Sequence, residues 1–242
     1  MRKNFNVSTL TVALEPQTLG NQSGLGTLLI ISGIEYLNKY FISKSSDGSV
    51  SEGFYMTSSE ISTDTPGPLF RLKTGTDSAT PSTNGVIAQN LLRLSSLLED
   101  ESYKTLAKET CNAFSVEVLQ HPFLFVGLLD AIVGLELGVK NVIGVLGHGE
   151  PTASEGPTSG GASSTEREVI QKLRDEAGTA ASTSAATLSL VDVRSSGGER
   201  TIQNKSHWLR KRNPLLKDLR PGKNFLLSCE AGKCRTIDIA PG

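Results

Sequence analysis

Residues 82–98 run Ser-Thr-Asn-Gly-Val-Ile-Ala-Gln-Asn-Leu-Leu-Arg-Leu-Ser-Ser-Leu-Leu. Apolar residues recur here every three or four positions, which predicts an amphipathic helix that begins at Ser82 or Thr83. One face of it would carry Val86, Ile87, Asn90, Leu91, Leu94, Leu97 and Leu98. This is the strongest helical signal in the chain, and it predicts a fold built from helices packed along that apolar face.

Two further helices are predicted directly downstream. One opens at Ser102, and its apolar face runs from Tyr103 to Val118. The other opens at His121-Pro122, where a proline in the first turn costs no hydrogen bond, and continues to Gly138. Because the connectors between these helices are only a few residues long, residues 82–138 are expected to pack as antiparallel neighbours.

The composition changes after residue 148, which predicts a boundary. Residues 149–165 consist mainly of Pro, Gly, Ser, Thr and Ala and are expected to form a flexible linker, because they bury too little apolar surface to offset their ordering entropy. Residues 166–242 alternate a charged helical segment with three strand-like segments, 186–193, 224–229 and 234–239. The expected organisation is a helical part over 1–148, the linker, and a small α/β part over 166–242.

Charge and hydropathy exclude several classes of partner. The 242 residues carry 24 basic and 25 acidic side chains, a net charge of −1, which argues against a nucleic-acid partner. The longest apolar run spans 25–34 and is too short for a membrane helix, so no membrane partner is expected. Three cysteines do not make a disulfide framework. We therefore expect a cytoplasmic protein.

A second motif overlaps the first helix. Residues 71–94 run Arg-Leu-Lys-Thr-Gly-Thr-Asp-Ser-Ala-Thr-Pro-Ser-Thr-Asn-Gly-Val-Ile-Ala-Gln-Asn-Leu-Leu-Arg-Leu. This stretch resembles a signature of the family that includes spermatogenesis-associated protein 20 and bacterial relatives of the YyaL type. The family pattern is Arg-x-Lys, then Asp-Gly-Ala-x-Pro-Ser-Gly-Asn-Ser, then a helix with Asn-Leu-Leu-Arg-Leu. The chain departs from it at Ser78, Thr83 and Gly85, which replace Gly, Gly and Ser.

The resemblance covers residues 35–140 and, more weakly, 167–242, whereas 1–33 form a divergent start. Gln120-His121-Pro122 and the closing segment with Cys229 and Cys234 also match the family. The family combines a thioredoxin-like domain with an (α/α)6 toroid like that of N-acylglucosamine 2-epimerases and six-hairpin glycosidases. The chain has no Cys-x-x-Cys motif and is expected to be truncated. The resemblance therefore implies a mainly α fold, a partial (α/α)6 toroid, followed by the small α/β appendix.

The best candidate ligand site precedes the helix at 82–98. Asp77, Ser82 and Asn84 can cap its free N–H groups, and the same helix end can receive an anionic or hydroxylated ligand. Arg71 and Lys73 would bring two cations to it. The alternative is a capped loop that merely begins a helix.

His121 is the candidate catalytic acid or base, because imidazole titrates near neutral pH. In the toroid enzymes that the resemblance implies, histidines at such positions act in this way. The alternative is a structural hydrogen-bonding group at a helix end. In an intact toroid Asp77, Arg71 and Asn84 would position a carbohydrate-like substrate for it, but the truncated chain is not expected to be catalytically competent alone.

Cys229 and Cys234 flank a four-residue turn between two predicted strands. They form a redox pair, half of a metal site, or simply a β-hairpin with two semi-buried cysteines; Lys233 and Arg235 can lower the thiol pKa. Zinc needs two more ligands, which the spacing does not offer, so no metal and no cofactor is expected.

Three functions remain open from the sequence. The first is binding or turnover of a carbohydrate-like small molecule. The second is a non-enzymatic scaffold whose exposed helix faces bind a second copy of the chain or another protein. The third is a thiol-based role of the two C-terminal cysteines.

Overall fold

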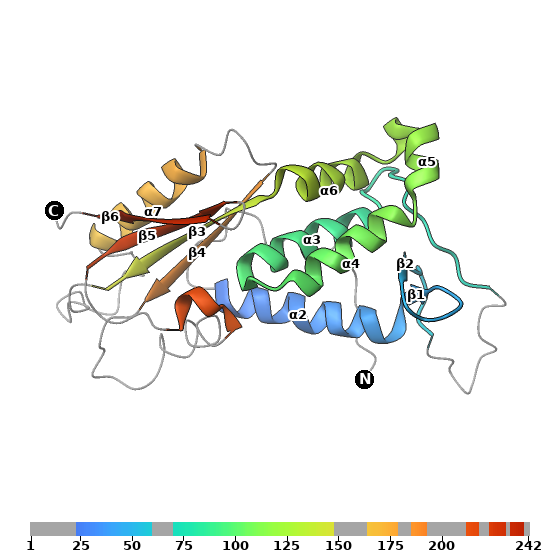
Figure 1. Cartoon of the computed structure of the whole chain (residues 1–242), viewed down its shortest axis with the longest axis horizontal. Coiled ribbons are helices and arrows are strands. Elements are labelled where there is room, and N and C mark those ends of the chain that lie inside the picture. The colour runs from blue at the N-terminus through green and yellow to red at the C-terminus, as the bar shows by residue number, and fades with distance from the viewer. Residues whose placement is uncertain are drawn as a thin grey trace. The chain divides into compact units, whose positions relative to one another are not determined.

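The computed structural model describes residues 23–59, 70–147, 164–178, 185–192, 212–217, 223–230 and 233–239 (Figure 1). Their contacts divide the chain into two compact units. The first unit holds the described residues of Gly26–Ser95 and Asp100–Leu137, and the second holds those of Pro16–Leu25, Ser96–Glu99 and Gly138–Gly242. The linker predicted over 149–165 lies outside the described residues except for its last two, which open a helix.

The first unit is built mainly of helices. They are α2 (Ser23–Tyr40), α3 (Thr83–Leu98), α4 (Glu101–Asn112), α5 (Ser115–Gln120) and α6 (Val126–Leu137), with the 3-10 turn η3 (Pro122–Leu124). The antiparallel strands β1 (Ile42–Lys44) and β2 (Ser51–Phe54) form a small sheet, and α4 packs against β2 and α6. The helix predicted from residue 83 is confirmed as α3.

Helix α3 is positioned by the burial of its apolar face in the core of the first unit. Leu91 and Leu94 are fully buried and Ile87 is 1% exposed, so the predicted apolar stripe is the face that packs in the core. Ser82 caps the helix, because its Oγ accepts a hydrogen bond from the Gly85 N–H at 3.1 Å. Local pattern and tertiary burial agree for this element.

The two helices predicted downstream begin and end at other residues. The segment with Phe114 and Val118 is split, because α4 ends at Asn112 and the buried Phe114 has non-helical backbone angles (φ −118°, ψ 14°) before α5. Pro122 opens a 3-10 turn, closed by the bond from the Phe125 N–H to the Pro122 carbonyl, and α6 begins only at Val126. The start of the third helix at His121-Pro122 was therefore wrong.

The second unit is a four-stranded sheet with one covering helix. Its elements are β3 (Val139–Leu146), α7 (Ser164–Gly178), β4 (Ala185–Asp192), the 3-10 turn η4 (Pro214–Leu216), β5 (Phe225–Glu230) and β6 (Lys233–Asp238). The strand order is β4-β3-β5-β6. β3 and β4 are parallel, and the crossover that parallel neighbours require contains α7, whereas β5 is antiparallel to both β3 and β6.

Helix α7 packs along one face of this sheet (Figure 1). Val169 and Leu173 from α7 meet Val142 of β3 and Leu226 of β5 in one buried cluster. Gly144 allows this close approach, since a Cβ there would lie 2.8 Å from a Leu173 methyl carbon. The charged helix expected near 166–177 is thus confirmed, and its apolar stripe closes the core of the second unit.

The predicted fold class, mainly α with a partial toroid, is wrong. The structure is mixed α/β: the described residues are 51% helical and 24% strand and form sheets of two and four strands. The physical reason lies in β3, which was assigned to the helical part. Strands on both sides and packing against α7 bury seven of its eight residues, so residues 142–146 form a run without polar side chains instead of the alternation typical of a half-exposed strand.

Candidate functional site

Asn84 fastens the start of α3 to β2. Its Oδ1 accepts a hydrogen bond from the Phe54 N–H at 2.8 Å, and its Nδ2 donates to the Phe54 and Thr74 carbonyls at 3.0 and 2.8 Å. The residue is fully buried. Its side-chain amide therefore pairs with the β2 backbone as a neighbouring strand would. All three of these hydrogen bonds are made to backbone groups of the protein.

Asp77 holds two helix starts at once. Its Oδ1 accepts from the Ser82 N–H and its Oδ2 from the Gly127 N–H, both at 2.7 Å. The first donor precedes α3 and the second lies in the first turn of α6, where the helix dipoles favour a negative charge. The helix end that was predicted to receive an anionic ligand already has an anion of its own.

Arg71 and Lys73 are held around the ring of Tyr55. The Arg71 guanidinium lies 4.1 Å from the ring centroid and donates to the carbonyls of Tyr40 and Thr57. Lys73 Nζ lies 5.6 Å from the same centroid and 3.4 Å from Glu52 Oε2. The structure thus brings the two cations together at Tyr55, whereas Asp77 and Ser82 meet at the helix starts and Asn84 faces β2.

His121 is exposed at the end of α5. Its backbone N–H donates to the Glu117 carbonyl, and its own carbonyl accepts from the Leu124 N–H. The imidazole lies edge-on to the Phe123 ring, with centroids 6.3 Å apart. Its part as an acid or base stays a prediction.

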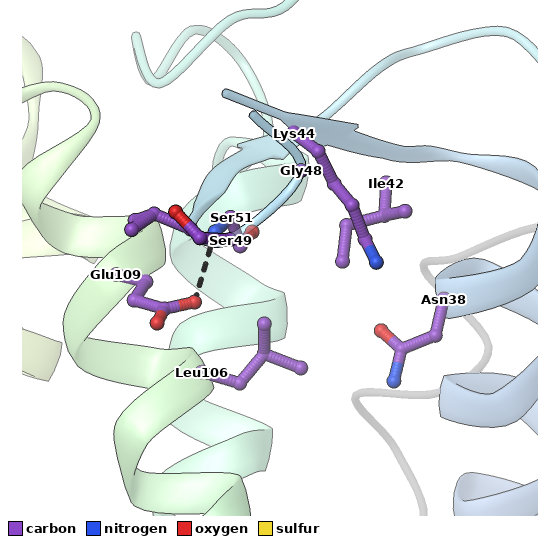
Figure 2. A pocket seen from close by; sticks show the side chains of 9 residues that line it. Asn38, Ile42, Lys44, Gly48, Ser49, Ser51, Leu106 and Glu109 are labelled. Carbon is purple, nitrogen blue, oxygen red and sulfur yellow. Dashed lines mark hydrogen bonds between the residues drawn. The ribbon is translucent and has the colours of Figure 1, made fainter. Parts of the chain in front are cut away.

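A pocket of about 280 Å³ opens in the first unit between α2, α4 and the β1–β2 turn (Figure 2). The Ser51 N–H donates to Glu109 Oε2 at 3.0 Å beside it. Asn38 Oδ1 is buried there without a hydrogen-bond partner among the described residues. The lining residues are Asn38, Ile42, Lys44, Gly48, Ser49, Val50, Ser51, Leu106 and Glu109. The sequence had no signal for this pocket, because its lining comes from three separate segments.

Cys229 and Cys234 face each other across β5 and β6 and are joined by a disulfide. Their Cα atoms lie 4.0 Å apart. Cys229 is 5% exposed, whereas Cys234 is exposed on β6, which lies at the edge of the sheet. The predicted hairpin strands are confirmed, and the two cysteine residues differ in exposure.

A charged cluster lies on the α7 side of the same hairpin. Glu176 Oε1 accepts hydrogen bonds from Lys140 Nζ at 2.8 Å, Ser228 Oγ at 3.0 Å and Arg235 Nη2 at 2.5 Å. Desolvation acts to raise the pKa of Glu176, but the hydrogen bonds from these three side chains and the Lys140 charge outweigh it and lower the pKa to about 2. Sequence reasoning missed the cluster, because Lys140 is the one charged residue of β3 and Glu176 is one charge among many on its helix.

Cys111, the third cysteine, is a buried free thiol in α4. Desolvation by burial raises its pKa from 9.0 to about 12. The thiolate is the reactive form, so this side chain is expected to be inert near neutral pH.

Nothing in the described part of the chain groups three or more side chains of the kinds that bind metals. Within those same residues, no helix is long and apolar enough to cross a bilayer. The chain matches no model of a known protein family, no curated protein and no solved structure.

Proposed function

We propose that the C-terminal hairpin is a thiol–disulfide exchange element, in which Cys229 and Cys234 cycle between a disulfide and two thiols. The observation that carries this proposal is the pairing of the two cysteines at directly opposite positions of β5 and β6, with one sulfur-bearing residue buried and the other exposed. Exchange requires an accessible sulfur and a partner within bonding distance, and this pair supplies both.

The reaction is a two-electron exchange with a client dithiol. A client thiolate attacks Sγ of the exposed Cys234, the bond between the cysteines breaks, and Cys229 leaves as a thiolate that takes up a proton. A second client thiolate then attacks the client sulfur of the mixed disulfide and releases Cys234. The client is oxidised to a disulfide, and the hairpin is reduced to two thiols.

The test is to equilibrate the protein with mixtures of reduced and oxidised glutathione and then count alkylated thiols by mass. We expect the Cys229–Cys234 pair to open and close together as the mixture changes, while Cys111 serves as an internal control. A pair that stays closed, or never closes, across all mixtures contradicts the proposal.

Two single variants test the direction of attack. Cys229→Ser leaves the exposed Cys234 and should collect a mixed disulfide with glutathione quickly. Cys234→Ser leaves the buried Cys229 and should react much more slowly, because oxidised glutathione cannot reach its sulfur. Equal rates in the two variants would show that Cys234 is not the sulfur that clients attack.

A second candidate function is protein–protein contact through the segment from α5 to the start of α6. Four of its apolar side chains are 61–84% exposed: Val116, Leu119, Phe123 and Val126. Exposed apolar side chains gathered in one short segment favour a partner surface. Sedimentation of the wild type and of the Leu119→Ser, Phe123→Ser double variant tests self-association, which the substitutions should weaken.

The resemblance to the spermatogenesis-associated protein 20 and YyaL family is a further proposal, and the motif at 71–94 supports it. A carbohydrate-like ligand and a cytoplasmic location stay predictions. The polar side chains of Arg71, Lys73, Asp77, Ser82 and Asn84 lend the ligand no support, since each makes hydrogen bonds within the protein.

A further inference from the structure

The cluster around Glu176 is tied to the cysteine pair by the register of the hairpin. Ser228 and Arg235 are directly paired on β5 and β6, and the next pair toward the turn is Cys229 and Cys234. Glu176 Oε1 accepts from both Ser228 and Arg235. One carboxylate oxygen therefore bridges the two strands at the pair beside the disulfide.

The edge strand β6 depends on such a link. In the sheet order, β5 is its one neighbour, and its residues are exposed except for a half-buried Ile237. When the disulfide opens, the covalent bond between the strands is lost, and backbone hydrogen bonds and side-chain contacts must keep Cys234 opposite Cys229. The Glu176–Arg235 contact is charge-assisted, and such hydrogen bonds are stronger than neutral ones.

The carboxylate is itself held in place. Glu176 Oε1 accepts from Lys140 Nζ, and the same ammonium also donates to the Glu176 backbone carbonyl at 2.8 Å. The side chains of Lys140 and Glu176 are 3% and 11% exposed. The anchor is therefore buried and fixed by the central strand, whereas the Arg235 side chain that reaches down to it is 65% exposed.

We propose that Glu176, acting through Arg235, is a positioning residue that holds Cys234 opposite Cys229 while both are thiols, and so favours re-formation of the disulfide when a small-molecule disulfide such as oxidised glutathione accepts the two electrons and is reduced to two thiols. This inference rests on the proposed exchange function. Holding two reacting groups in place raises their effective concentration, and ring closure of a dithiol depends directly on that quantity. Arg235 touches no client and no sulfur in this scheme; it acts only by keeping β6 on β5.

The chain offers a matched pair of variants. Lys233 and Arg235 flank Cys234, and both side chains lie on the face of β6 opposite to that of Cys234 because successive residues of a strand alternate. Arg235→Gln and Lys233→Gln each remove one positive charge beside the cysteine, but Arg235 carries the bond to Glu176. If only the positive charge beside the thiol matters, both variants should change the equilibrium constant for disulfide closure equally. If Arg235 positions β6, only Arg235→Gln should change it.

The experiment measures the equilibrium constant for disulfide closure against glutathione in the full chain. Arg235→Gln should lower it by about two- to fivefold, the size expected for a half-exposed ion pair. Lys233→Gln should stay close to the wild type, and Arg235→Lys should recover part of the loss. Thermal unfolding of each variant in reductant checks that the fold is kept.

Two results overturn the inference: an Arg235→Gln constant equal to that of the wild type, or an equal fall in Lys233→Gln. If the pair closes but does not oxidise a client dithiol, the proposed function fails alone, and the two variants still decide the positioning role. If the wild-type pair never re-forms its disulfide, both are overturned.

Discussion

Two buried polar clusters, one in each unit, differ in what they bind. At the start of α3, Asp77 and Asn84 make their hydrogen bonds to backbone groups of the protein, and the cluster joins helix starts to β2. Beside β5 and β6, Glu176 is bonded by three side chains from three strands, at the residue pair next to the Cys229–Cys234 disulfide. The first cluster joins helix starts to β2, whereas the second lies beside the cysteine pair for which we propose disulfide exchange.

The difference shows that residue types alone do not identify a site. The stretch at 71–84 has the cations, the carboxylate and the amide that a ligand site needs, and the structure uses them for its own backbone. A polar cluster is a functional candidate when it positions a group with chemistry of its own, such as a pair of cysteines.

Glu176→Gln should have the largest effect and lower the free energy of unfolding of the second unit by about 3–5 kcal/mol. The Lys140 side chain is 3% exposed and would keep its charge without the carboxylate that compensates it. Urea unfolding and hydrogen exchange in α7 and β3 measure the loss. Glu168→Gln on the same helix is the control, because its pair with Lys172 is 40% exposed on both sides and should cost below about 1 kcal/mol.

Asn84→Ala should lower the stability of the first unit by about 3 kcal/mol, because it leaves the Phe54 N–H and two carbonyls buried without partners. Thermal unfolding measures this, with the exposed Asn112→Ala as control. The comparison between the clusters fails if Asn84→Ala keeps full stability and instead abolishes a thermal shift that a panel of sugars produces in the wild type.

Acid should weaken the second unit by an amount on the order of 2 kcal/mol through Glu176 alone. The native pKa of this carboxyl is about 2, below its usual 4.5, so the unfolded chain binds the proton first as the pH falls. The stabilisation is complete above about pH 4.5 and is lost as the pH approaches 2. Unfolding free energies across this range should show the loss in the wild type and not in Glu176→Gln; parallel pH curves would contradict it.

Asn38→Leu should have the smallest effect, a gain of about 1 kcal/mol for the first unit. It removes a buried acceptor that lacks a partner among the described residues and places an apolar side chain near Ile42 and Leu106. Thermal unfolding measures the gain, with Asn38→Ser as a control that keeps an acceptor. A loss of stability would indicate that the pocket holds a molecule that bonds to Asn38 Oδ1.

Part of the fold was predictable because its signals are local. The period of α3, its cap at Ser82 and the antiparallel strands that carry Cys229 and Cys234 depend on residues close together in the chain, and each prediction is confirmed. The break between α4 and α5 was not predictable in this way. It depends on where the buried Phe114 packs, and Gly75, which lies far from it in sequence, leaves room for that ring.

The amino-acid sequence by itself determined which segments form helices and hairpins, because the spacing of apolar residues and the turn residues act over a few positions. Only the tertiary structure decided that β3 joins β4 and β5, that Asp77 bridges α3 and α6, and that Glu176 bonds to Arg235. Each of these contacts joins residues distant in the chain. Many such long-range contacts are compatible with the sequence, and burial and hydrogen-bond pairing determine which of them form only when the whole unit is packed. The cysteine pair depends on both the sequence and the tertiary structure. Its two strands are close together in the chain, whereas Glu176 comes to lie beside them only through the packing of α7 on the sheet.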